Sequence, residues 1–241
     1  MTLSQILLEK SYKITFSRNP VPVFKQINNG TKFTGITKIL KKIFYDKHSN
    51  NYIPNKKYHK NIKNVRGIKG GCKIHTQLQD YYARGVRQNI DSRTKSIINW
   101  LKKSELKVLY TEYPVGDEKK RIATAIDLLC IDKKDNILLL EIKTGYDANY
   151  TSKTKYNMRH PMNELNQSYW SQHQLQMLAS RELFISHTGI IPSKCLLIRV
   201  DSNIQPNKKN HNIHMYPLLP VLHNKGPILL KEMHKYLMKK N

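Results

Sequence analysis

The stretch that decides the fold is Ile137–Lys143, which reads Ile-Leu-Leu-Leu-Glu-Ile-Lys. Its length and near-continuous hydrophobicity predict a central strand that is buried on both faces. Glu141 and Lys143 are two positions apart, so both side chains leave the sheet on the same side. Burial of two charged groups costs desolvation free energy. The pair therefore predicts either specific partners or a place where the sheet opens into a cleft.

A second apolar run, Ala123–Ile131, is interrupted by one charged residue, Asp127. The residues between the two runs, Asp132–Asn136, have the length and composition of a hairpin turn. This hairpin places Asp127 beside Glu141. Two carboxylates and a lysine at one point form a site for a divalent cation that faces a phosphate, because Mg2+ and Mn2+ prefer oxygen ligands and activate water.

The combination of Asp127 with Glu141-Ile142-Lys143 resembles the signature of the PD-(D/E)XK nucleases. The proline of that signature is absent, since Ala125 and Ile126 precede the aspartate. The alternative interpretation is a surface hairpin with an incidental ion pair, because an aspartate followed by Glu-x-Lys recurs by chance in lysine-rich chains.

Two further motifs are similar to those of the RecB-like and lambda-type exonuclease branch of this superfamily. Gly71 stands four residues before His75 at the start of an amphipathic segment, and Gln172-x-Gln174 lies on the helix expected after the Glu-x-Lys strand. The resemblance implies that Gln172 orients the catalytic groups and that Gln174, the alternative, contacts DNA. Without the resemblance, a histidine or glutamine on a helix is an ordinary packed or solvent-facing residue.

The resemblance also implies a metal site. Its expected ligands are side chains and one backbone carbonyl: His75, Asp127, Glu141 and the carbonyl of Ile142. Lys143 is expected to face the attacking water or the scissile phosphate. Glu112, in the preceding strand, is either an additional upstream acid or a solvent-facing residue. Members with an iron-sulfur cluster use four cysteines, so this chain, which has three, is expected to lack one.

The fold implied by the resemblance is α/β, with a restriction-endonuclease-like αβββαβ core, a central mixed sheet and flanking helices. The resemblance covers roughly Gly67–Val200. We expect residues 67–241 to form the nuclease domain and the basic residues 1–66 to pack against it. The first twenty residues fit either an ordinary N-terminal helix or an organellar presequence. The patterns predict helices from Gly70, over Ser92–Lys103 and over Asn163–Phe184, and strands over Lys107–Val115 and Lys194–Val200.

The formal net charge is +25, from 42 basic and 17 acidic residues. A charge of this sign implies a polyanionic partner, and DNA is the leading candidate. Lys153, Lys155 and Arg159 follow the Glu-x-Lys strand and are expected to contact the DNA backbone. The alternative is that abundant Lys, Asn and Ile reflect A/T-rich codons. No membrane partner is expected, because no apolar run approaches the ~20 residues of a spanning helix.

The three cysteines, Cys72, Cys130 and Cys195, are widely spaced and form no CxxC pair. This pattern disfavours a disulfide framework and a zinc ribbon and favours a reducing compartment. The nucleus or cytoplasm is therefore expected, with the mitochondrion as the alternative.

Taken together, the residues and the resemblance predict a Mg2+- or Mn2+-dependent DNA exonuclease that acts in replication, recombination or repair, with a replication or recombination protein as a partner. The first alternative is an endonuclease on RNA or branched DNA, because the same residues serve both reactions. The second is a catalytically inert nucleic-acid-binding protein. Three charged residues in two buried strands argue against that second alternative.

Overall fold

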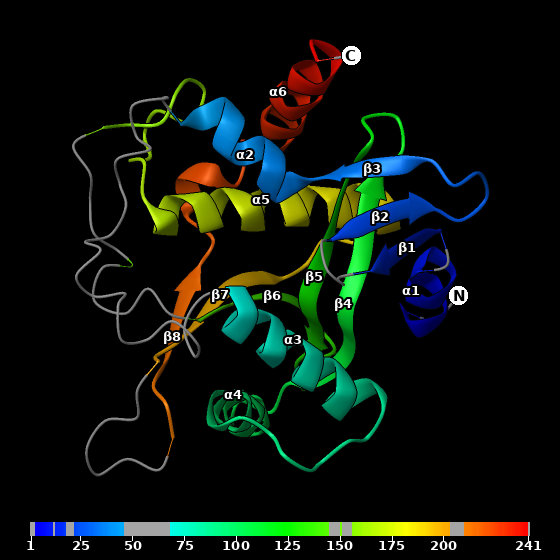
Figure 1. Ribbon diagram of the computed structural model, residues 1–241, viewed down its shortest axis with the longest axis vertical. Coiled ribbons are helices and arrows are strands. Elements are labelled where there is room, and N and C mark those ends of the chain that lie inside the picture. The colour runs from blue at the N-terminus through cyan, green and yellow to red at the C-terminus, as the bar shows by residue number, and fades with distance from the viewer. Residues whose placement is uncertain are drawn as a thin grey trace.

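A mixed sheet of eight strands lies at the centre of the molecule. The structure is a computed structural model that describes residues 3–11, 13–17, 22–45, 68–144, 150, 156–202 and 210–240. Figure 1 shows helices on both faces of the sheet. The strands are β1 (Ile14–Ser17), β2 (Val23–Gln26), β3 (Lys32–Gly35), β4 (Lys107–Asp117), β5 (Ile122–Ile131), β6 (Ile137–Thr144), β7 (Lys194–Val200) and β8 (Ile213–Pro217).

Alternating side chains of the central strands bury two separate apolar layers. On one face, Leu128, Leu138 and Leu140 pack with residues of α3 (Ile68–Ala83) and α4 (Ser92–Lys103). On the other face, Leu129 and Leu139 pack with residues of three further helices, α2 (Ile36–Phe44), α5 (Tyr169–Thr188) and α6 (Gly226–Met238). β5 and β6 are covered on both sides, which explains their near-continuous apolar sequences.

The element order from α3 to β7 confirms the predicted αβββαβ core and the mixed sheet. β4, β5 and β6 are antiparallel neighbours, and β7 returns parallel to β6 after α5. Both ends of the helix predicted over Asn163–Phe184 differ from the prediction, and the helix ends at Thr188. The helix expected from Asn163 begins at Tyr169, because the hydroxyl of Ser168 accepts a hydrogen bond from the backbone N–H of Ser171 and caps the helix there.

The described part of the N-terminal region joins the same sheet. After α1 (Leu3–Ser11), strands β1, β2 and β3 form an antiparallel meander, and β3 pairs in parallel with β5 at Thr34↔Ile122 and Gly35↔Ala123. The sequence interpretation did not predict these three strands. Each has only four residues, which is too short for an alternating pattern to stand out.

The sheet opens along one edge of β5, and this opening positions the candidate site. β4 pairs with β5 from Ile122 to Ile131 and occupies the whole of one edge. The other edge is shared by β6, which pairs with residues 128–131, and by β3, which pairs with residues 122 and 123. Between these two pairings lies residue 127. Figure 1 shows β6 and β7 diverging from β4 and β5.

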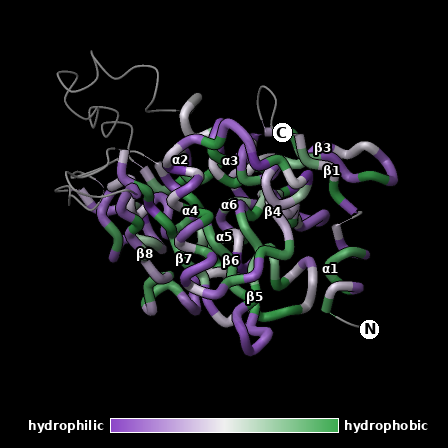
Figure 2. The backbone as a smooth tube through the Cα atoms, turned by 90° about the horizontal axis from the view of Figure 1, so that it is seen from below, coloured by the Kyte–Doolittle hydropathy of each residue, from purple (hydrophilic) through white to green (hydrophobic). Residues whose placement is uncertain are grey.

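Hydrophilic segments lie at several outer turns, and hydrophobic segments run through the middle of the molecule (Figure 2). Among the described residues, no helix has the length and apolar character that crossing a membrane requires.

Candidate metal centre

Asp127 lies where the β5–β6 ladder ends. The last ladder pair is Leu128↔Leu140, and beyond it Oδ2 of Asp127 accepts a hydrogen bond from the backbone N–H of Ile142 at 2.7 Å. The carboxylate thus satisfies a donor that would otherwise be left by the diverging strands. Asp127 as a whole is 5 % exposed. This local bond fixes the carboxylate at the opening and leaves its second oxygen, Oδ1, for other partners.

Glu112 stands opposite Asp127 on β4, between the pairs Thr111↔Leu128 and Tyr113↔Ile126. Its backbone has φ +52°, in the left-handed region that side chains with a Cβ rarely adopt. Such strain costs of order 1–3 kcal/mol and is found mainly at functional sites. The consequence in this molecule is that the Glu112 carboxylate meets α3 and is buried there.

His75 reaches both carboxylates from α3. Its Nδ1 lies 3.0 Å from Oε1 of Glu112 and 3.3 Å from Oδ1 of Asp127. One ligand atom from each of the three residues lies within 4.8 Å of the others. Because an ionised carboxylate only accepts hydrogen bonds, a hydrogen bond from His75 to either ionised acid requires a proton on Nδ1. A cation bound by all three groups would replace that proton.

A second cluster of polar side chains lies on the α5 side of the opening. Nζ of Lys143 is 2.6 Å from Oε1 of Glu141 and donates to Oε1 of Gln176 at 3.2 Å. The amide Nε2 of Gln176 in turn donates to Oε1 of Glu141. Glu141 and Lys143 therefore do leave β6 on the same side, and their partner is a glutamine of α5.

Glu141 has the clearest electrostatic perturbation of the site. Burial and the neighbouring charge of Asp127 raise the pKa of Glu141 to about 7, although Lys143 works in the opposite direction. A buried carboxyl group with this pKa is partly protonated near neutral pH. Its ionised fraction increases when the pH rises or when more positive charge comes close.

The donor set fits a divalent cation. One imidazole nitrogen and two carboxylate oxygens suit Mn2+, and the two carboxylates alone also suit Mg2+. The three side chains are held by different elements, α3, β4 and β5, so the site depends on the complete fold. Lys143, near the same opening, supplies a cationic group that can face an anionic substrate.

The structure places most of the predicted site residues near one another, in a different grouping from the one expected. His75 and Asp127 lie together as expected, and the third member of their cluster is Glu112. Glu141 instead contacts Lys143 and Gln176. The backbone of Ile142 takes part through its N–H, which binds Asp127; the expected role of its carbonyl remains a prediction.

The contact expected of Gln172 is made by Gln176, one helical turn later on the same face of α5. Gln174 points elsewhere. Its Nε2 donates to the carbonyl of Pro217 at 3.1 Å, and its Oε1 accepts from the N–H of Leu219 at 3.0 Å, so it ties α5 to the end of β8. The sequence could have indicated Gln176, because its i, i+4 spacing from Gln172 places both side chains on one face of the helix.

Two of the predicted DNA-backbone contacts, Lys153 and Lys155, lie outside the described residues. Arg159 is exposed, and its backbone N–H donates to the carbonyl of Phe44 at 3.1 Å. The segment that carries Arg159 is thereby attached to the end of α2.

No protein-family model and no curated protein matches the chain. Among solved structures, it is similar to an alkaline exonuclease from Laribacter hongkongensis, with 13 % identity over 86 % of this chain and 92 % of that one, at a TM-score of 0.41. It is also similar to a candidate exonuclease from Eubacterium rectale, with 9 % identity over 70 % of each chain, at a TM-score of 0.38. At these values the similarity by itself assigns no activity to this chain.

Proposed function

We propose that this chain is a divalent-metal-dependent nuclease that hydrolyses phosphodiester bonds in DNA. The observation that supports the proposal is the clustering of His75, Glu112 and Asp127 within 4.8 Å at the point where the sheet opens, beside Lys143. A purely structural role does not require two buried carboxylates and a largely covered histidine at one point, because burial of such groups costs desolvation free energy.

In this proposal His75, Glu112 and Asp127 hold the cation. When bound, a divalent cation lowers the pKa of a water molecule and polarises a phosphoryl oxygen. Asp127 has a further role, because its bond to the Ile142 N–H keeps its other oxygen directed toward His75. Glu112 is held in place by the left-handed backbone of β4.

Lys143 is the cationic group that stabilises the charge developing on the phosphoryl oxygens. Gln176 positions it, since the same amide group binds both the Lys143 amine and the Glu141 carboxylate. Glu141, with its pKa near neutrality, accepts and returns a proton at the site as surrounding charge changes. These roles require only residues that already converge at the opening.

The chain's net charge of +25 supports nucleic acid as the substrate, since neutralising phosphates releases counterions and drives association. We retain exonucleolytic action on DNA, in replication, recombination or repair, as the more specific proposal. Lys153, Lys155 and Arg159 are proposed to contact the DNA backbone.

The test is a nuclease assay on end-labelled linear DNA and on circular single strands, with Mg2+ or Mn2+ and with EDTA. The proposal predicts release of nucleotides from linear DNA that EDTA abolishes, and an intact circle. Cleavage of the circle would show that the protein acts as an endonuclease and not as an exonuclease. Absence of metal-dependent cleavage on every DNA and RNA substrate would favour the binding-protein alternative.

A further inference from the structure

An open pocket of about 440 Å³ lies at the corner between α3 and α4, outside the candidate metal centre. Four side chains line it: Tyr81, Tyr82, Arg87 and Lys102. The two tyrosines come from the last turns of α3, the arginine from the loop that follows, and the lysine from the end of α4. The lining thus consists of two cations and two aromatic rings.

Arg87 is oriented before any ligand binds. Its guanidinium carbon is 3.7 Å from the centroid of the Tyr81 ring, and the Tyr82 ring packs edge-on against Tyr81 with centroids 5.0 Å apart. Stacking on an aromatic face holds the planar guanidinium and leaves its N–H donors at the rim. Burial raises the pKa of Tyr82 to about 12, so its phenol stays neutral and adds no negative charge to the pocket.

The positive charges of the pocket are not neutralised by the neighbouring acids. Asp80 pairs with Arg84, and Glu105 pairs with Lys133. Among the described residues, neither Arg87 nor Lys102 lies in an ion pair with a carboxylate. Two cations that face one open space repel each other, and a bound anion would relieve that repulsion.

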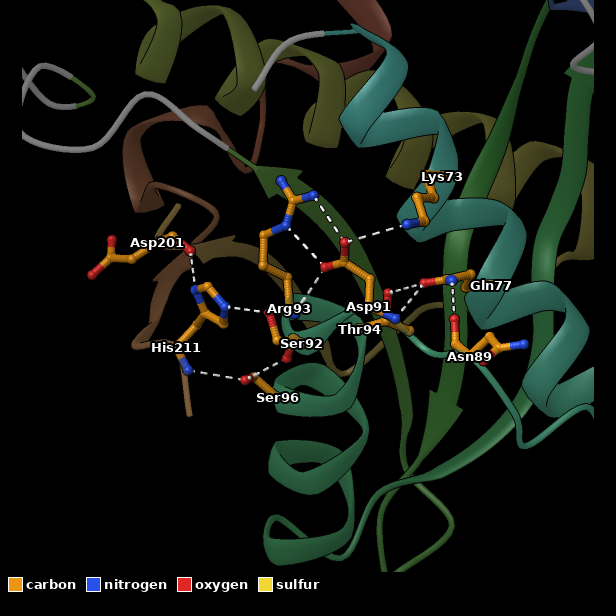
Figure 3. A network of polar contacts seen from close by, with 10 residues as sticks. All are labelled: Lys73, Gln77, Asn89, Asp91, Ser92, Arg93, Thr94, Ser96, Asp201 and His211. Carbon is orange, nitrogen blue, oxygen red and sulfur yellow. Dashed lines mark hydrogen bonds and ion pairs between the residues drawn. The ribbon is translucent and has the colours of Figure 1, made fainter. Parts of the chain in front are cut away.

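The loop that carries Arg87 is fixed on both sides, and Figure 3 shows the contacts on the side that follows it. Before it, the N–H of Val86 donates to the carbonyl of Asp80. After it, Gln77 of α3 donates to the carbonyl of Asn89 and accepts from the N–H of Asp91, both at 3.0 Å. A guanidinium on such a loop loses little further freedom on binding, which favours affinity.

The pocket and the candidate metal centre share α3. Tyr82 follows His75 by seven residues, so the two side chains lie on the same side of the helix, roughly 10 Å apart along its axis. A strand of nucleic acid with one phosphate at the metal centre extends far enough to place another phosphate, a few nucleotides away, at this pocket.

We propose that this pocket binds a backbone phosphate of the nucleic-acid strand whose scissile phosphate lies at the metal centre. The inference rests on the proposed nuclease function. Arg87 supplies paired N–H donors to the phosphate oxygens and Lys102 supplies a second positive charge, a combination suited to phosphate and indifferent to base sequence. The site therefore fixes the position of the strand relative to the metal centre.

The experiment measures binding of a short labelled single-stranded DNA in EDTA, where no cleavage occurs, across a range of salt concentrations. The variant Arg87→Gln/Lys102→Gln is compared with wild type and with a control, Lys134→Gln/Lys231→Gln, which removes two exposed cations elsewhere. We expect the pocket variant to bind about tenfold more weakly, with a log–log salt slope lower by about one unit. The control is expected to keep the wild-type slope.

Arg87→Lys keeps the charge and removes the planar fork, so an intermediate loss is expected if the stacked geometry matters. If the double variant does not fold, Arg87→Lys alone tests whether the pocket binds a DNA phosphate. Equal slopes for wild type, pocket variants and control would overturn the proposal. Binding of inorganic phosphate that depends on Arg87, with unchanged DNA affinity, would also overturn it in favour of a small-anion site. Failure of the nuclease proposal is separate, since it appears only in the metal-dependent cleavage assay.

Discussion

Asp127 illustrates how one residue links the fold to the proposed chemistry. One of its oxygens replaces the ladder bond that β5 and β6 no longer make, and the other faces His75. A carboxylate with both functions must be where the strands separate. The apolar run around it made the position conspicuous in the sequence, because a lone charge in a buried strand needs a reason.

Glu112 provides a test of the strained backbone at the site. In an ordinary strand Gly is less stable than Ala by roughly 0.5–1 kcal/mol. At φ +52° we expect the opposite order, with Glu112→Gly more stable than Glu112→Ala by about 1 kcal/mol, since Ala bears the left-handed penalty and Gly does not. Chemical denaturation of both variants without metal measures the difference. If Ala is the more stable variant, Glu112 does not adopt this backbone conformation.

Glu141 should make the metal-free protein less stable as pH rises. The carboxyl ionises near its ordinary pKa of 4.5 when the chain is unfolded, and near 7 when it is folded. Between these values the folded chain holds a proton that the unfolded chain has lost, so the free energy of unfolding falls with increasing pH. The sign is the reverse of that for a salt-bridged carboxylate.

This pH effect is measured by comparing the melting temperatures of wild type and Glu141→Gln in EDTA from about pH 4.5 to about pH 7, the window set by the shift. The difference between the two proteins should grow across that range in favour of the glutamine variant. The difference between the two proteins reports the titration of Glu141 together with its coupling to Asp127 and His75. Parallel curves for the two proteins would show that Glu141 keeps an ordinary pKa.

At the scale of elements, sequence patterns predicted the strands and helices of the core. They did not predict how α5 lies across the sheet, which decides which of its side chains face β6. β5, β6 and β7 are apolar runs with turn residues between them, and α4 was predicted with its observed bounds. Which glutamine of α5 faces Lys143 depends on how the helix lies across the sheet. Helical spacing places Gln172 and Gln176 on one face, and only the packed structure selects Gln176.

The glutamines of α5 should separate structural from catalytic effects. Gln174→Met leaves the Pro217 carbonyl and the Leu219 N–H without a partner and should lower the free energy of unfolding by about 1–3 kcal/mol. Gln176→Met should change stability less and lower the cleavage rate, because Lys143 and Glu141 lose the amide that holds both. Unfolding free energy and the cleavage rate per folded molecule are the two measurements. A reversed pattern would assign the positioning role to Gln174.

Glu112 shows a second limit of sequence reasoning. Its strand was predicted, and its side chain was left open between an additional acid and a solvent-facing residue. Its contact with His75 depends on a left-handed backbone at one position, which no hydrophobic pattern encodes. For Glu141, the place at the end of β6 was predicted, and the contact with Gln176 was not.

For the whole molecule, the excess of basic residues predicts strongly salt-dependent DNA binding. Neutralising Lys153, Lys155 and Arg159 together should weaken binding to all sequences alike and lower the log–log salt slope by about two to three units. The measurement is affinity for a fixed DNA across salt concentrations, with Lys134→Gln/Lys231→Gln as a control for charge removal. An unchanged slope would mean that these three residues do not contact phosphate.

The central claim is that His75, Glu112 and Asp127 bind a metal on which cleavage depends, with Glu141 and Lys143 beside it. Most DNA affinity should come from other cations, so Asp127→Asn, Glu141→Gln and Lys143→Ala should each bind DNA within about tenfold of wild type. Each should lose ~100-fold or more in cleavage, since the loss falls on charge stabilisation in the transition state.

The most direct measurement is therefore the rate of metal-dependent nucleotide release by these three variants beside wild type, with DNA affinity and melting temperature determined on the same preparations. The three variants are expected to fold and to bind DNA without cleaving it. Variants that cleave as fast as wild type would show that the chemistry occurs elsewhere in the chain.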